Sequence, residues 1–263
     1  MTGAGYKYHL PTVGSISVSR VNEATAIPAV KPTFGKIDIT IKKLAAIIPM
    51  SNELLKDANV DVVNLLSVLA AESFAKYEDE WGFLGKNSGE GIFQNASVSV
   101  LTMAATKTTY AQVTADNLLD AISLLDESAV AGAKWYMTFS VFNVLRKLKD
   151  NNGQYLVQPP TGGQPATIWN MPVEFVRVMP KTSVGSQAGT AFLAVGDLSY
   201  MLFADKKEYS FEISNEATIT DTDGTTAINL WQQDMSAVRV MERIDIELAE
   251  AAKAFVVVKT NAS

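Results

Sequence analysis

The sequence predicts an α+β fold, and three patterns support that prediction. A helical pattern spans residues 61–84, which at about 1.5 Å per residue gives a helix roughly 36 Å long. Residues 209–219 and 236–248 alternate apolar and polar side chains, as long strands with one covered face do. Between them, residues 110–206 mix short helices with strands that lack polar alternation, typical of strands covered on both faces. The chain should therefore join a compact α/β unit to an elongated unit of helix on sheet.

The beginning of the chain has the pattern of a long hairpin, which we place at residues 13–48. Two stretches alternate apolar with polar side chains, with apolar positions at Ile16, Val18, Ile37, Ile39 and Ile41. Residues that interrupt strand pairing lie between them, at Pro28, Pro32 and Gly35. A hairpin is marginally stable alone, and no apolar surface of the same chain is evident for its isoleucines, so a neighbouring subunit should cover them. Residues 1–12 should form a separate N-terminal segment.

The elongated unit should begin near residue 49, with Ser51 as the N-cap of a first helical turn. In the long helix, one face follows three- and four-residue spacing through Val62, Leu66, Leu69, Ser73 and Tyr77, with Leu65, Phe74 and Trp81 beside it. The helix should end where glycines gather, at Gly82, Gly85, Gly89 and Gly91. The acidic run 78–80 predicts a solvated or subunit-facing helix end rather than a metal site.

The α/β unit should start near residue 110. Thr114 and Ser140 are the expected N-caps of two helices, the second of which should stop at residues 151–153. Apolar strands are expected at residues 134–139, 173–179, 191–195 and 254–258. Residues 49–108 and 207–248 are thereby assigned to the elongated unit, and residues 109–206 and 249–263 to the α/β unit.

Composition argues against an enzyme. The 263 residues are 48% apolar and 19% charged, enough for a sizeable core. With no cysteine, the chain can have no disulfide, thiolate zinc site or cysteine nucleophile, and its single histidine, His9, lies in a terminal segment expected to be mobile. A net charge of −6 disfavours binding to nucleic acid through a basic face. The sequence contains no membrane-spanning run and no secretory signal, and we expect no cofactor and no metal.

Two short motifs are better explained by local structure than by chemistry. Ser73-x-x-Lys76 matches the S-x-x-K of penicillin-recognising enzymes, but 19 serines and 17 lysines yield about one such match by chance and the companion motifs are missing. Asp221-x-Asp223-Gly224 resembles the start of a calcium loop, but Gln232 stands where the loop needs a glutamate, so a hairpin turn is favoured.

Three further sequence features give little indication of a functional site. The glycines from Gly85 to Gly91 follow a helix and lack G-K-S/T, which disfavours a phosphate site. The sequon at residues 95–97 has meaning only in a secreted protein. Glu242 is a carboxylate on the apolar side of a predicted strand, either functional or paired with Arg239 or Arg243; pairing is favoured, because a buried unpaired carboxylate is costly.

Several ordered segments carry a resemblance to a known family. They are Lys31-Pro32-Thr33-Phe34 with Ile37, Ile39 and Ile41; Ile48-Pro49 with Ser51, Glu53-Leu54-Leu55 and Asp57; Tyr77-Glu78-Asp79-Glu80 with Gly85, Gly91 and Ile92; Leu148-Lys149-Asp150 with Gly153, Tyr155, Ile168-Trp169 and Pro172-Val173; Val195-Gly196-Asp197-Leu198; and Glu242-Arg243-Ile244-Asp245. In this order they resemble the major capsid protein of tailed bacteriophages, with the Hong Kong ninety-seven type fold. The resemblance covers nearly all of the chain.

The resemblance implies names and a role for the predicted units. The α/β unit would be the axial (A) domain, the elongated unit the peripheral (P) domain with its spine helix, and the hairpin the E-loop. The chain would self-assemble as pentamers and hexamers into an icosahedral shell that encloses double-stranded DNA without sequence-specific contacts. Scaffold and portal proteins and a decoration protein are the implied partners. The implied location is the virion capsid, assembled in the host bacterial cytoplasm.

The sequence also departs from the family. Family precursors often carry an N-terminal scaffolding segment, whereas about a dozen residues precede the first predicted strand here, which predicts a trimmed or separately scaffolded form. Some relatives join subunits through a Lys–Asn isopeptide bond assisted by a glutamate. Lys31 occupies the lysine position, but Asp234 and Met241 occupy the other two, so self-crosslinking is not expected. An encapsulin-type nanocompartment and, less favoured, a hydrolase using Ser73 and Lys76 remain as alternatives.

Overall fold

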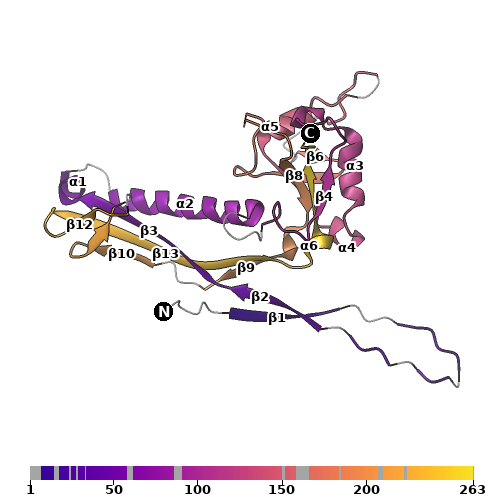
Figure 1. Cartoon of the computed structure of the whole chain (residues 1–263), viewed down its shortest axis with the longest axis horizontal. Coiled ribbons are helices and arrows are strands. Elements are labelled where there is room, and N and C mark those ends of the chain that lie inside the picture. The colour runs from indigo at the N-terminus through magenta and orange to yellow at the C-terminus, as the bar shows by residue number, and fades with distance from the viewer. Residues whose placement is uncertain are drawn as a thin grey trace.

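The chain has the predicted α+β fold. The computed structural model describes residues 7–14, 18–23, 25–27, 29–32, 34–57, 62–85, 91–149, 152–157, 166–183, 185–206, 210–221 and 224–262. Figure 1 shows three parts: a compact unit at one end, the long helix α2 (Val62–Leu84) lying along extended strands, and a hairpin that projects below both. Nothing in the described part of the chain is a helix long and apolar enough to cross a membrane.

The hairpin exists, but its first strand lies earlier than predicted. Strand β1 (Lys7–Val13) pairs antiparallel with β2 (Phe34–Thr40). The strand expected around Ile16 and Val18 is not found: residues 15–17 lie outside the described residues, and Val18 is 94% exposed and outside any strand. The strand that pairs with β2 is stabilised by cross-strand apolar contacts, since the register places Tyr8 opposite Ile39 and Leu10 opposite Ile37.

His9, which we expected in a mobile terminal segment, lies in a paired strand. His9 is part of β1 directly opposite Asp38 of β2. Its Nδ1 lies 2.5 Å from Oδ1 of Asp38, whose other oxygen accepts a bond from Lys36 Nζ at 2.9 Å. These two bonds, the Lys36 bond first, hold the pKa of Asp38 below its usual range. Both side chains are about half exposed, so the cluster is a surface feature of the ribbon.

The elongated unit is built on an antiparallel sheet. Its strands are β3 (Lys42–Ser51), β9 (Met201–Asp205), β10 (Ser210–Ser214) and β13 (Met235–Leu248). The central strand β13 pairs with β3, β10 and β9, and it confirms the strand predicted at 236–248. The single strand predicted at 209–219 is wrong. It is divided by a bend at residues 215–216 into β10 and β11 (Thr218–Thr220), and β11 pairs with β12 (Ala227–Asn229); Tyr209 lies outside the described residues.

The predicted long helix is confirmed as α2, but the side chains it buries differ from those predicted; Asp61 lies outside the described residues. Helix α1 (Asn52–Asp57) precedes it, and the Ser51 hydroxyl accepts a bond from the Leu54 amide at 3.3 Å, as its predicted cap role requires. The side chains of Ala70, Phe74 and Trp81 face the sheet, whereas Leu65 and Leu69 are about half exposed. Because the sheet covers only one side of α2, three- and four-residue spacing alone could not tell which row would be buried.

The compact unit contains a six-stranded sheet in the order β4-β14-β8-β5-β7-β6. These strands are β4 (Ser99–Thr102), β5 (Lys134–Met137), β6 (Thr167–Ile168), β7 (Met171–Phe175), β8 (Ala191–Gly196) and β14 (Phe255–Lys259). The helices around them are α3 (Ala115–Ser123), α4 (Glu127–Val130), α5 (Phe139–Leu145) and α6 (Ala251–Ala254), with 3-10 turns at Tyr110–Gln112 and Leu198–Tyr200. The apolar strands predicted at 134–139, 191–195 and 254–258 are present as β5, β8 and β14, and β14 returns from the end of the chain as expected. The strand predicted at 173–179 is only partly right, because β7 ends at Phe175 and residues 177–179 form a turn and a bend.

Of the two N-caps predicted for this unit, one is confirmed and the other is wrong. Thr114 caps α3, and its hydroxyl accepts a bond from the Asn117 amide at 3.4 Å. Ser140 is not a cap, because α5 begins at Phe139 after the cap residue Thr138; the helix also ends at Leu145, before the expected stop at residues 151–153. The Ser140 hydroxyl instead accepts a bond from the Thr182 amide at 3.2 Å, which ties α5 to the segment after β7.

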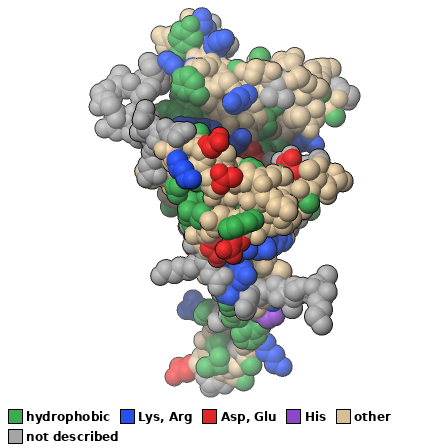
Figure 2. All heavy atoms as spheres, turned by 90° about the vertical axis from the view of Figure 1, so that its left-hand side faces the viewer, with side chains coloured by type: hydrophobic (Ala, Val, Ile, Leu, Met, Phe, Trp, Pro, Cys, Tyr) green, Lys and Arg blue, Asp and Glu red, His purple; other side chains and the backbone are tan. Residues whose placement is uncertain are grey.

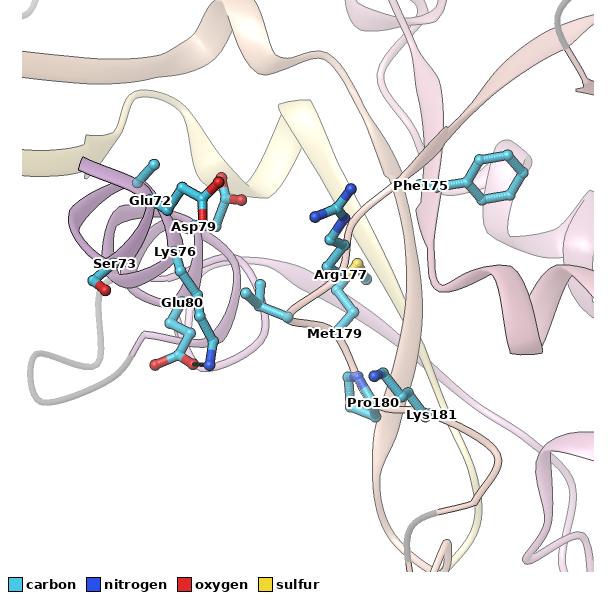
Figure 3. Close-up of a pocket in the computed structure, with 12 residues that line it drawn as sticks. Glu72, Ser73, Lys76, Asp79, Glu80, Phe175, Arg177, Met179, Pro180 and Lys181 are labelled. Carbon is cyan, nitrogen blue, oxygen red and sulfur yellow. Dashed lines mark ion pairs between the residues drawn. The ribbon is translucent and has the colours of Figure 1, made fainter. Parts of the chain in front are cut away.

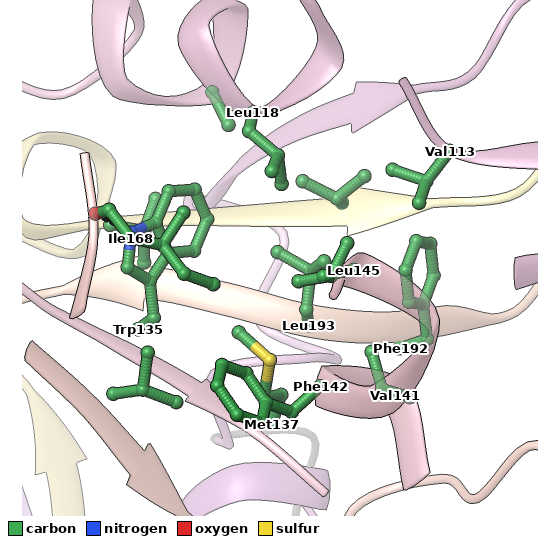
Figure 4. Close-up of a cluster of buried hydrophobic side chains, with 14 of the residues drawn as sticks. Val113, Leu118, Trp135, Met137, Val141, Phe142, Leu145, Ile168, Phe192 and Leu193 are labelled. Carbon is green, nitrogen blue, oxygen red and sulfur yellow. Dashed lines mark hydrogen bonds between the residues drawn. The ribbon is translucent and has the colours of Figure 1, made fainter. Parts of the chain in front are cut away.

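The main core lies inside the compact unit. Figure 4 shows Leu118 of α3, Leu145 of α5, Trp135 of β5 and Leu193 of β8 meeting between the sheet and its helices. The Trp135 indole is fully buried and donates to the Ile168 carbonyl at 3.1 Å, which satisfies the one polar atom it carries. This core holds the sheet of the compact unit to its helices.

Candidate assembly surfaces

The tip of the hairpin, by which we mean the described residues between β1 and β2 together with Phe34 at the start of β2, exposes large apolar side chains. The exposed fractions are 94% for Val18, 83% for Ile27 and 75% for Phe34. The tip extends past the rest of the chain in Figure 1, and Figure 2 shows apolar side chains on the narrow lower part of the molecule, where the hairpin lies. Exposed apolar patches of this kind mark contact sites for other macromolecules. The tip is therefore the clearest candidate for a contact with another subunit.

The base of the hairpin is covered by its own chain, which corrects one expectation. Ile39 and Ile41 are 5% and 8% exposed, because they line a hollow of about 510 Å³ whose other walls include Leu202 and Phe203 of β9. The Thr40 amide also donates to Asp245 Oδ2 of β13 at 2.6 Å. The prediction that no surface of the same chain covers these isoleucines is thus wrong, because β9 and β13 supply the cover.

Other apolar side chains are exposed on the elongated unit. On the outer face of α2, Leu65, Val68 and Leu69 are each about half exposed, and Ile47 on β3 is 51% exposed. Strand β3 is an edge of its sheet, so its outer backbone groups are open to another chain. Trp231, 73% exposed, lies in the turn between β12 and β13. The elongated unit therefore offers several surfaces suited to contacts between subunits.

Ser73 and Lys76 do not form a catalytic pair. The Ser73 hydroxyl donates to the Leu69 carbonyl one turn earlier at 2.8 Å, and Lys76 Nζ lies 3.8 Å from the Glu80 carboxylate. A nucleophile–base pair would need these two side chains to share a hydrogen bond. Figure 3 shows Lys76 directed toward Glu80, so the hydroxyl and the ammonium both serve the helix itself.

The same face of α2 borders a cleft of about 940 Å³ between the two units. Its helical wall carries Glu72, Asp79 and Glu80, and Arg177 and Lys181 extend from the segment after β7 on the other side. Burial raises the pKa of Asp79. The cleft has walls of opposite charge, and no group of three or more acidic or histidine side chains in the described residues is arranged to hold a metal ion.

The remaining sequence candidates occupy turns. The Gly224 amide donates to the Asp221 carbonyl at 3.0 Å, and the Asp221 amide to the Thr226 carbonyl, within the β11–β12 hairpin; Asp223 lies outside the described residues. The Asn95 side chain accepts a bond from the Ser97 amide at 2.9 Å. Gly85 ends α2 with a φ of +68°, which favours glycine; Gly89 lies outside the described residues. These contacts stabilise local turns and the end of the helix.

Glu242 is not paired with Arg239. Arg239 forms an ion pair with Glu212 of β10, its direct cross-strand neighbour. Because side chains alternate along a strand, Glu242 points to the opposite face from Arg239 and Arg243 and toward α2. Its neighbour there is Glu78, and the proximity of Glu242 helps to raise the pKa of the Glu78 carboxyl. Glu78 is half-buried rather than solvated, so the acidic end of α2 is partly a contact with the sheet.

Two of the three positions of the family crosslink, Asp234 and Met241, show how this chain differs. Asp234 has a φ of +49° and its Oδ1 accepts a bond from Asn52 Nδ2 at 2.6 Å. Met241 lies in β13 opposite Ser210. The carboxyl at position 234 is therefore engaged within its own chain, and position 241 offers no carboxylate to move a proton.

We expect assembled particles of this protein to show no covalent ladder. Particles boiled in detergent should give one band near the 28.4 kDa of the single chain, because a thioether cannot replace the catalytic carboxylate of the crosslink. Denaturing electrophoresis checks this. A particle preparation of Met241→Glu with Asp234→Asn serves as the comparison, and ladders from the unaltered chain would contradict the prediction.

A compact α/β unit, a long helix on a long antiparallel sheet, and a projecting hairpin together define the fold of tailed-phage capsid subunits. The structure of the capsid of an empty GTA particle aligns with a TM-score of 0.76 at 19% identity, over 100% of this chain and 86% of that one. A structure from Mycobacterium phage Adephagia aligns with a TM-score of 0.70 at 18% identity, over 98% of this chain and 86% of that one.

Sequence comparison agrees with the fold. The model of the phage capsid family matches residues 2–260. The major capsid protein of Staphylococcus phage 80alpha is 25% identical over 234 residues, which cover 88% of this chain and 68% of that protein. The major capsid protein of Klebsiella oxytoca phage phiKO2 is 24% identical over 243 residues, covering 89% of this chain and 55% of that protein. The chain belongs to the phage capsid family and is a structural protein of a phage capsid.

Proposed function

We propose that copies of this chain assemble as pentamers and hexamers into an icosahedral virion shell that encloses double-stranded DNA. The observation that carries the proposal is the hairpin, whose base is fixed to β13 while its apolar tip projects without cover. Family membership and the likeness to solved capsids support the same conclusion. The chain would thus be a major capsid protein.

The energetics of such a shell depend on repetition. Covering one large apolar side chain is worth about 1.5–3 kcal/mol, so each hairpin tip contributes modestly. In a closed symmetric assembly every subunit makes the same contacts, and these modest contributions recur around the shell. The net charge of −6 lets packaged DNA lie inside without tight binding to the wall. Scaffold, portal and decoration proteins would then be partners, and assembly would take place in the host bacterial cytoplasm.

We expect the purified chain, alone or with its scaffold, to form large hollow particles. Light scattering across salt and protein concentrations, followed by negative-stain electron microscopy, measures this directly. A single monomer peak under every condition would contradict the proposal. Nuclease-protected DNA in particles from infected cells supports a virion shell, whereas particles filled with one cargo protein would point to a nanocompartment.

A further inference from the structure

Glu78 lies on the face of α2 that packs against the sheet. It follows Phe74 by four residues and precedes Trp81 by three, and both of these aromatic side chains are buried. Residues at these spacings share one face of a helix. A carboxyl group is therefore placed between the two main apolar anchors of the helix.

Glu242 holds the matching place on β13. It lies between Val240 and Ile244, which point to the same face because side chains alternate along a strand. Phe74 belongs to the buried cluster that contains Val240, and Trp81 to the cluster that contains Ile244. The helix and the strand are thus in register on both sides of this place, and the carboxyl group of each faces that of the other.

We propose that Glu78 and Glu242 share one proton and form a latch between α2 and β13, which opens when the proton is lost. Two ionised carboxylates have only acceptor atoms and repel each other, whereas a carboxylic acid can donate to a carboxylate. The shared proton would therefore turn a repulsive contact into a hydrogen bond at the centre of the helix–sheet interface. The proposal concerns the single chain and does not rest on shell assembly.

The surroundings of the pair favour the protonated state. Burial, followed by the hydrogen bond and the charge of Glu242, raises the pKa of Glu78 to about 7, and the charges of Asp79 and Asp205 add to the rise. The other charged groups on the elements packed here are Glu72, Lys76 and Glu80 on α2, Lys42 and Lys43 on β3, Lys206 after β9, and Arg239, Arg243, Asp245 and Glu247 on β13. Lys42 Nζ lies 4.9 Å from the centre of the Trp81 ring, and Arg239 is held by Glu212.

The direction of the pH effect follows from linkage. The Glu78 pKa is about 7 in the folded chain against 4.5 for an unperturbed glutamate, so the folded state holds more protons between these values. Stability from this pair is then fully present below about pH 4.5 and is lost as the pH rises through about 7. Because Glu78 is partly exposed, solvent screening reduces the size of the effect.

The test measures the unfolding of the unassembled full-length chain in urea from pH 5 to pH 9. Glu78→Gln and Glu242→Gln are compared with the unaltered chain, and Glu72→Gln, an exposed position on α2, is the matched control. At pH 8.5 either pair variant should lower the unfolding equilibrium constant by roughly tenfold, the equivalent of about one pKa unit. At pH 5.5 the variants and the unaltered chain should differ little, since an amide can replace the carboxylic acid as a donor.

A second readout separates the latch from general charge repulsion. Amide hydrogen exchange along α2 should speed up above pH 7, beyond the intrinsic pH dependence, near Glu78 in the unaltered chain and in Glu72→Gln, but not in Glu78→Gln. The proposal is overturned if unfolding of the unaltered chain shows no pH dependence, or if Glu72→Gln flattens it equally. It is also overturned if a chelator alone changes the pH profile, because the pair would then hold a metal ion instead of a proton.

Discussion

Replacing Ile27 and Phe34 together with aspartate should abolish shell assembly while the chain still folds. Both side chains are more than 70% exposed on the hairpin tip, so the folded monomer loses no buried contact. If a neighbouring subunit covers them, the change removes about 3–6 kcal/mol of apolar burial per subunit. That loss should raise the concentration needed for assembly by a hundredfold or more. Light scattering measures assembly, and circular dichroism with thermal unfolding measures the fold.

The conservative pair Ile27→Val with Phe34→Leu is the control, since it keeps the tip apolar and should still assemble. Ile39→Asp gives the opposite pattern, because Ile39 is 5% exposed against its own chain and its replacement should destabilise the monomer. Normal shells from the double aspartate variant would show that the tip contacts no neighbour. Loss of the monomer fold in that variant would show that the tip is covered by its own chain.

Gly91→Ala should destabilise the chain by about 3 kcal/mol, at the upper end of overpacking effects. A Cβ at this position would lie 2.1 Å from the Gly85 amide nitrogen and 2.6 Å from the Trp81 carbonyl oxygen. Both are backbone atoms at the end of α2, and the following residues return hydrogen bonds to the helix, such as that from the Ile92 amide to the Gly82 carbonyl at 3.0 Å. Relief of the clash must therefore move the backbone.

For a chain of this size, that loss should lower the melting temperature by roughly 6–12 °C. Differential scanning calorimetry of the unassembled chain measures it. Gly185→Ala is the control, because nothing lies within 4 Å of its added Cβ and its φ is not in the left-handed region. An unchanged melting temperature for Gly91→Ala would show that the backbone around Gly91 can move away from the end of α2 at little cost in free energy.

Periodicity predicted the elements whose pattern was long and whose burial was simple. Helix α2 and strand β13 were found within one residue of the predicted boundaries that the described residues can test. Strands β5, β8 and β14 of the compact unit were found because both of their faces are covered, which leaves an uninterrupted apolar run. The pattern did not predict β1. Its apolar side chains Tyr8 and Leu10 are recognisable as part of a strand only once their partners on β2 are known.

The candidate surfaces were predictable only in part. An isoleucine-rich hairpin indicated a contact with a neighbour, but the sequence could not show that β9 already covers Ile39 and Ile41. Glu242 was recognisable as the one carboxylate in an apolar row. Its partner could not be predicted, because Glu78 is 164 positions away and the register between α2 and β13 is set by packing.

By itself, the sequence determined the α+β class, the long helix, the central strand and the absence of cysteine chemistry, since each depends on local period or composition. Only the tertiary structure decided which row of α2 is buried, how far the hairpin is covered by its own chain, and which two carboxyl groups meet. Those outcomes depend on contacts between elements distant in the chain, such as Asp245 with Thr40 and Glu78 with Glu242. The local periodicity of apolar residues determines which faces of a helix or strand are apolar, and tertiary packing determines which other elements cover those faces.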